Sequence, residues 1–147
     1  MSVRLAAFAA LCLMVSGCAT GPTLQQSQAS VPQLSPDRGR IFFYRTNSYF
    51  GSAIQPYVKL DGVAIGDSVP GGVLYCDVVP GRHIASVSTE VDRTVDFNVV
   101  AGQATYVKMD WGVGFIMARI QIEVVPSDVG AGEAATSSLM KSQCLRT

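Results

Sequence analysis

Residues 73–88, VLYCDVVPGRHIASVS, decide the fold because they hold two strand-like runs separated by a proline and a glycine. Val73 to Val79 is rich in β-branched and aromatic residues, which favour strands. Proline presets the φ angle of the first turn residue and glycine accepts the left-handed second position, so Pro80-Gly81 predicts a turn. His83 to Ser88 then continues as a second strand. The stretch predicts two short strands joined by a tight turn.

The same pattern of short strands and turns continues on both sides of this stretch. Asp61-Gly62 separates two strand-like runs and is typical of a type I′ hairpin, in which both turn residues have positive φ. Val95, Phe97 and Val99 alternate with polar residues, as in a strand with one face in water. The expected strands are residues 40–45, 57–60, 63–65, 73–79, 83–88, 94–100, 104–111 and 114–125.

Seven or eight such strands with turns near every tenth residue predict an all-β domain over residues 39–147. The expected fold is a small antiparallel β-sandwich, with a small barrel as the alternative that the same signals allow. The tail from residue 126 contains Gly130 and Gly132, so only residues 133–141 are expected to form a short helix.

The first 17 residues predict a secretory signal peptide. Arg4 supplies the positive charge, and the apolar run over residues 5–15 is much shorter than the about 20 residues that cross a bilayer. We expect residues 1–17 to be absent from the mature protein.

Val15-Ser16-Gly17-Cys18 resembles the lipobox of bacterial lipoproteins. The resemblance implies cleavage between Gly17 and Cys18, a diacylglycerol thioether on Cys18, and an acyl chain such as palmitate on the new amino group. Two or more acyl chains anchor a protein stably to a membrane. Many inner-membrane lipoproteins have aspartate at the position after the lipidated cysteine. This chain has Ala19 there, so sorting to the outer membrane is expected. An ordinary signal peptide with a chance cysteine is the alternative.

Residues 18–38 are expected to form the lipid anchor and a flexible tether. Residues 19–37 contain three prolines, many Gln and Ser, and no aromatic side chain, a composition that buries little apolar surface.

The charge balance argues against a nucleic-acid partner, which a basic surplus would favour. The chain has 11 basic and 11 acidic side chains, and loss of Arg4 leaves 10 against 11, a formal charge of about −1.

We expect no enzymatic activity, cofactor or metal. The sequence has no serine elbow, no glycine-rich loop between a strand and a helix, and no paired carboxylates at a recognisable spacing. His83 is the sole histidine and lacks neighbours at metal-ligand spacing, so it is expected to be structural or exposed.

Cys76 and Cys144 remain after Cys12 leaves with the signal peptide and Cys18 is lipidated. An even pair in an oxidising compartment is a candidate disulfide. In the alternative, Cys76 shares a strand face with Leu74 and stays a buried free thiol.

Two further stretches are candidates for binding. Tyr49 and Phe50 lie in a Ser- and Asn-containing loop, a composition common at protein interfaces; the alternative is that both rings fold back over the core. Residues 111–118 are apolar and could insert into a membrane or partner, although an inward-facing strand explains them more simply.

Five segments of the chain resemble the bacterial lipoprotein family that carries domain of unknown function 2846. They are GRIFFYR (39–45), PYVKLDGVAIG (56–66), LYCDVVPGRHIASVS (74–88), VVAGQATYVKMDW (99–111) and GFIMARIQIEVV (114–125). The middle portion is also similar to the PEGA module, a small β-sandwich. Both resemblances imply an all-β domain in the bacterial envelope, and neither supplies catalytic residues.

The expected function is therefore an outer-membrane lipoprotein that docks on an envelope protein or the cell wall. A periplasmic small-ligand binder, with a pocket between the sheets or under the Tyr49 loop, is the alternative.

Overall fold

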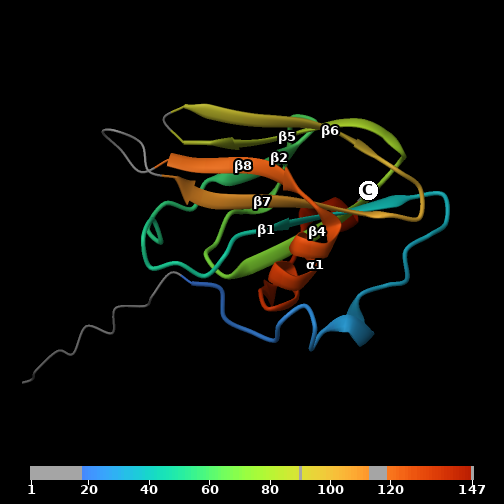
Figure 1. Ribbon diagram of the computed structural model, residues 1–147, viewed down its shortest axis with the longest axis horizontal. Coiled ribbons are helices and arrows are strands. Elements are labelled where there is room, and N and C mark those ends of the chain that lie inside the picture. The colour runs from blue at the N-terminus through green and yellow to red at the C-terminus, as the bar shows by residue number, and fades with distance from the viewer. Residues whose placement is uncertain (1–17, 90, 113–118, 147) are drawn as a thin grey trace, which may run out of the picture.

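The computed structural model describes residues 18–89, 91–112 and 119–146, and within them the chain forms two packed β-sheets (Figure 1). One sheet has five strands in the order β8 (Arg119–Val125), β7 (Ala104–Gly112), β1 (Gly39–Tyr44), β4 (Gly72–Val78) and β9 (Ser138–Leu139). The other has four, in the order β3 (Val63–Asp67), β2 (Tyr57–Leu60), β5 (Gly81–Ser88) and β6 (Asp92–Val99). The predicted all-β sandwich is confirmed.

Eight of the described strands lie where the sequence predicts them, each within a few residues. The predicted strand over residues 114–125 is described only from Arg119, and its earlier residues lie outside the described part of the chain. The additional β9 has two residues and pairs in parallel with β4. β1 and β7 are also parallel, so the five-stranded sheet is mixed and the expectation of a purely antiparallel sandwich is wrong for these pairs. Side-chain alternation reports which face is buried but not the direction of a distant partner strand.

The two turns that define the sequence pattern have different roles. Asp61 and Gly62 have φ values of 50° and 82°, as the predicted type I′ hairpin between β2 and β3 requires. Pro80-Gly81, by contrast, takes the chain from β4 in one sheet to β5 in the other. The stretch that predicts the fold therefore crosses between the two layers.

The main core fills the space between the sheets with aliphatic and aromatic side chains. Its buried members are Ile41, Phe43, Val58, Leu60, Ile65, Leu74, Cys76, Ala85, Val87, Val99, Val107, Met109 and Ile120. Full burial of one such large side chain stabilises the fold by roughly 2 kcal/mol. Val95 and Phe97 of β6 pack against this core from the inward face, as their alternation predicts.

A second apolar cluster lies on the outer face of the five-stranded sheet. Phe42, Tyr44, Val73 and Tyr75 are buried there under the helix α1 (Ser127–Ala135). β1 is therefore covered on both faces, which its apolar run from Ile41 to Tyr44 favours.

The short helix begins earlier than predicted and ends at Ala135, so the expected span of residues 133–141 is wrong. Gly130, an expected interruption, lies inside the helix at its contact with the sheet. A Cβ atom at Gly130 would lie 2.3 Å from Cβ of Tyr106, so only glycine allows this close approach.

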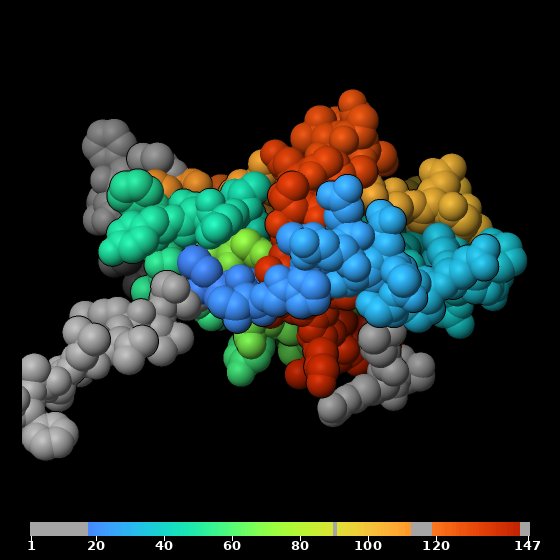
Figure 2. Space-filling view, turned by 90° about the horizontal axis from the view of Figure 1, so that it is seen from below, coloured from blue at the N-terminus to red at the C-terminus, as the bar shows by residue number. Residues whose placement is uncertain are grey.

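Residues 18–38, expected to be a flexible tether, lie against the domain. Figure 2 shows this segment, in blue, running across the face that also carries α1. Leu24 donates its backbone N–H to Ser137 over 2.8 Å, and Thr23 forms a β-bridge with Ser138. Leu24 and Val31 pack against the second cluster. The composition of residues 18–38 shows that the segment cannot form a core of its own. The folded domain nevertheless gives the segment an apolar face to pack on and backbone groups to bond.

Candidate functional site

Cys18 lies at one end of the sandwich, where the β3–β4 loop turns. Its thiol is unpaired and partly exposed, and the next residue, Ala19, donates its backbone N–H to Pro70 over 2.9 Å. Gly72 is also in contact, because a Cβ atom built there would lie 3.3 Å from Cβ of Ala19. The predicted lipidation residue is therefore held next to the folded domain. Its neighbour Gly17 and the rest of the predicted signal peptide lie outside the described residues.

The loop between β1 and β2, residues 45–56, lies at the same end and is held by a buried arginine. The Arg45 side chain is 1% exposed and donates to the carbonyl oxygens of Gly51, Ile54 and Ser68 over 2.8, 2.6 and 3.0 Å. Burial lowers the pKa of Arg45. The planar guanidinium group has five N–H donors, so it can bond several carbonyl oxygens at once. The predicted strand over residues 40–45 includes Arg45, but sequence analysis missed this role because the carbonyl groups that Arg45 contacts lie in loops.

The two predicted loop aromatics point away from the core. Tyr49 is 88% exposed and Phe50 is 68% exposed, so they do not cover the sandwich. The Phe50 ring stacks on Trp111 with centroids 5.9 Å apart, and Tyr49 meets Phe50 edge to face at 6.3 Å. The loop thus presents two aromatic rings on a fixed base.

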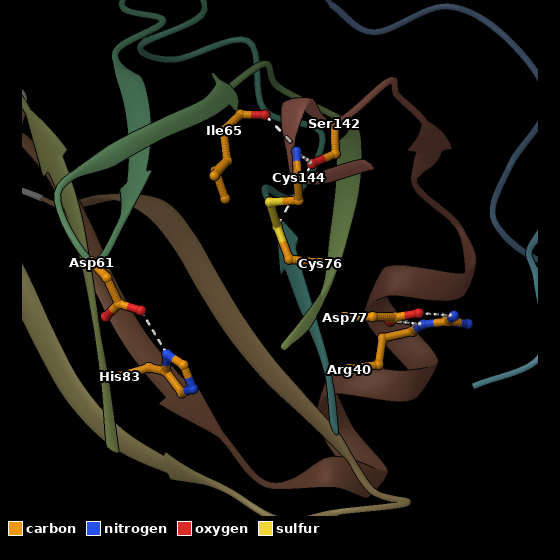
Figure 3. Close-up of a disulfide and its surroundings, with 8 residues drawn as sticks. All are labelled: Arg40, Asp61, Ile65, Cys76, Asp77, His83, Ser142 and Cys144. Carbon is orange, nitrogen blue, oxygen red and sulfur yellow. Dashed lines mark hydrogen bonds and ion pairs between the residues drawn. A yellow bond between two sulfur atoms is a disulfide. The ribbon is translucent and has the colours of Figure 1, made fainter. Parts of the chain in front are cut away.

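Cys76 and Cys144 form a disulfide, as the sequence predicts, and Figure 3 shows it between β4 and the C-terminal segment. Their Cα atoms are 5.4 Å apart. Ser142 lies beside the bond, with its hydroxyl 3.6 Å from the Cys76 sulfur. The bond fixes η2 (Gln143–Arg146) to the main core.

His83 is buried and bonded through both ring nitrogens, which confirms a structural role over an exposed one. Nδ1 lies 2.6 Å from a carboxylate oxygen of Asp61 (Figure 3), and Nε2 lies 2.9 Å from the Val79 carbonyl oxygen. Burial is the largest single influence and lowers the pKa of His83. The hydrogen bond to Val79 and the Asp61 carboxylate together outweigh it, so the net pKa lies above the ordinary 6.5.

We expect an NMR titration of His83 to give a midpoint above 6.5 in untagged protein, where its ring signals have no other histidine to overlap. Asp61→Asn should lower the midpoint while keeping an acceptor for the Ile84 N–H. The pKa of His83 is higher in the folded protein than in the unfolded chain. The contact with Asp61 therefore stabilises the fold below pH 6.5, and this stabilisation is lost as the pH rises through the folded-state pKa. A wild-type midpoint at or below 6.5 would contradict this assignment.

A polar cluster that sequence analysis missed joins α1 to the outer face of the sheet. The Tyr44 hydroxyl donates to Glu133 over 2.5 Å, and the Lys108 ammonium group lies 3.0 Å from the same carboxylate. Burial, more than the neighbouring carboxylate, raises the pKa of Tyr44, while the Tyr44 hydrogen bond lowers that of Glu133. Burial lowers the pKa of Lys108, but its two carboxylate neighbours outweigh this and raise it. These shifts hold each group in its ordinary charge state at neutral pH, as a structural contact requires.

Two surface hollows are candidates for a small ligand. One of about 240 Å³ lies beside the disulfide and is lined mainly by Leu60, Val63, Ile65, Val78 and Cys144. The other, of about 330 Å³, lies on the outer face between residues 24–31, α1 and the sheet. Both open at the surface, and neither is the enclosed pocket between the sheets that the ligand-binding alternative predicts.

Among the described residues, no group of three or more His, Cys, Asp or Glu side chains could hold a metal ion. In the same part of the chain, no helix is both long and apolar enough to cross a membrane.

The fold and these contacts define a β-sandwich domain whose C-terminal segment is linked to the core by a disulfide. The chain belongs to the family described as protein of unknown function (DUF2846), whose model matches residues 35–119. The expected resemblance to domain of unknown function 2846 is thus confirmed, whereas the similarity of the middle portion to the PEGA module stays a prediction. The chain is also similar to an uncharacterized protein of Haemophilus influenzae, with 26% identity over 124 residues that cover 80% of this chain and 73% of that protein. No solved structure matches the chain significantly.

Proposed function

We propose that the chain is a lipoprotein of the bacterial outer membrane, attached through acyl chains on Cys18. The observation that carries this proposal is the motif Val15-Ser16-Gly17-Cys18. Among the cysteines that the structure describes, Cys18 is unpaired, since Cys76 and Cys144 bond to each other. The Cys18 thiol is therefore available for a thioether.

The disulfide supports an extracytoplasmic location. Such bonds form and persist in the periplasm and at cell surfaces, and they are rare in the cytosol. Residues 1–17 have the charge and apolar length of a signal for that compartment.

The sandwich acts, in this proposal, as an interaction or structural module of the envelope. Buried side chains from both sheets pack together between the layers, which supports a domain that works through its surface. Exposed apolar side chains suited to a partner include Val63 and Ile84 on the four-stranded sheet. No catalytic step is assigned to any residue.

Replacement of Cys18 by alanine tests the anchor. We expect the wild-type protein to fractionate entirely with the outer membrane, and the Cys18→Ala protein to keep residues 1–17 or to become soluble. Mass spectrometry of the wild type should find the chain starting at an acylated Cys18. Normal cleavage and continued membrane fractionation of the variant would refute the anchor.

Crosslinking in the same intact cells tests the interaction role. The wild-type chain should give adducts larger than the monomer, and these should be reduced when Cys18→Ala removes the chain from its membrane. Recovery of monomer alone from wild-type cells would count against the role.

A further inference from the structure

The geometry points to a membrane-docking surface: we propose that the β1–β2 loop rests at the level of the lipid headgroups, with the Tyr49 and Phe50 rings inserted beside Cys18. This inference rests on the proposed lipid anchor. Its partner is the surface of a zwitterionic bilayer, because residues 46–56 contain no charged side chain.

First, the proposed anchor, Cys18, lies a short distance from the folded domain. Ala19 bonds to Pro70, so the chain leaves the lipidated residue directly onto the fold. A 19-residue random tether would hold the domain some tens of ångströms from the bilayer, roughly 20 to 60 Å. With residues 18–38 packed along the sandwich, the end that carries Cys18 must face the membrane at close range.

The second step is that the aromatic loop lies at this same end. Gly71 donates its backbone N–H to Arg45 over 3.0 Å, and a Cβ atom built at Gly71 would lie 3.4 Å from Cβ of Asn47. The β1–β2 loop and the β3–β4 loop that holds Ala19 are therefore in contact. Figures 1 and 2 agree, since the blue segment begins beside the blue-green loop in both views.

The third step is the chemistry of the exposed side chains. Tyr49 and Phe50 are the most exposed large hydrophobic residues of the described chain, and Tyr57 at the start of β2 is exposed as well. Aromatic rings gather at membrane interfaces, where a ring enters the acyl boundary and a hydroxyl stays among headgroups. Without such an environment, these rings would expose apolar area to water, which is unfavourable in free energy.

The fourth step is the rigidity of the loop. Arg45 bonds the Gly51 and Ile54 carbonyls, and Phe50 stacks on Trp111. Insertion would therefore cost little conformational entropy, because the rings are already held in place.

The test uses the lipidated full-length chain with a single tryptophan at the loop tip. Trp111, the sole tryptophan of the chain, is changed to Phe, and Phe50→Trp then places the probe in the loop. The matched control carries Val100→Trp in the same background. Val100 is exposed and follows β6 at the opposite end, where β1 and β7 begin. Both proteins are reconstituted into phosphatidylcholine vesicles, with or without lipid brominated near the headgroup.

We expect the loop probe to shift its emission to the blue and to lose roughly half of its intensity in brominated vesicles, at low and at high salt. The Val100→Trp probe should not change. Vesicle-bound protein with an unquenched loop probe would overturn the docking surface while leaving the anchor intact, as would equal quenching of the two probes. A loop probe that is shielded in native outer membranes but exposed in protein-free vesicles would assign the loop to a protein partner and also overturn the proposal. Failure of the wild-type protein to float with vesicles would instead overturn the anchor itself.

Discussion

Replacing Cys144 by serine should lower the free energy of unfolding by about 4 kcal/mol. The disulfide joins Cys76 of β4 to the C-terminal segment across 68 residues, and the unfolded chain gains the freedom of that loop when the bond is lost. The other contacts of the C-terminal segment with the core are weaker, and they include those of the Ser142 hydroxyl with Cys76 and with the Ile65 carbonyl oxygen. For a domain of this size the melting temperature should fall by roughly 10–15 °C.

Chemical denaturation with and without reductant checks this value in a Cys18→Ser background, which removes the free thiol. Reductant should lower the stability of the parent by as much as Cys144→Ser does, and it should leave the variant unchanged. Because Cys76 is fully buried, reduction must be carried out in denaturant and confirmed by thiol alkylation. A parent protein whose midpoint is the same in both thiol states would show that the bond does not stabilise the fold.

Local sequence signals predict the strands because each strand has one consistent environment. β6 alternates inward valine and phenylalanine with outward polar residues, and β1 is apolar from Ile41 to Tyr44 because a second cluster covers its outer face. The Asp61-Gly62 turn is predicted in detail because positive φ at two successive positions restricts the residues that fit.

The parts that sequence analysis missed depend on contacts between distant segments. Residues 18–38 pack because the folded domain offers them an apolar cluster and backbone partners such as Ala135 and Ser137. Gly130 weakens an isolated helix, yet it is required where α1 meets Tyr106. The parallel pairing of β1 with β7 joins strands about sixty residues apart, which no local pattern encodes.

In the candidate site, too, sequence analysis predicts some residues and misses those that depend on contacts between distant segments. Composition singles out Cys18, the cysteine pair, and the exposed loop rings Tyr49 and Phe50. It does not reveal Asp61 as the partner of His83, because the hairpin must form before these side chains meet. Nor does it reveal the role of Arg45, because the carbonyl groups of Gly51, Ile54 and Ser68 meet its side chain only in the folded chain.

Arg45→Met should be among the most destabilising single changes, with a loss of about 3–5 kcal/mol. Methionine replaces the apolar stem but provides no donor for the carbonyls of Gly51, Ile54 and Ser68. A buried ion pair can be exchanged for apolar residues when both partners change, but backbone carbonyls cannot be removed. The loss should therefore appear both as lower stability and as faster hydrogen exchange in residues 46–56.

Equilibrium unfolding and hydrogen exchange measure the two effects, with Arg82→Met as the matched control. Arg82 also makes several contacts to one partner, Asp96, but both side chains are exposed to water. Since solvent screens such a pair and hydrates the partner that remains, Arg82→Met should leave the unfolding midpoint nearly unchanged. Arg45→Lys, which keeps the charge but not the planar set of donors, should fall between wild type and Arg45→Met. Equal effects of Arg45→Met and Arg82→Met would mean that the buried contacts do not hold the loop, and that the loop aromatics lack the fixed base on which membrane docking depends.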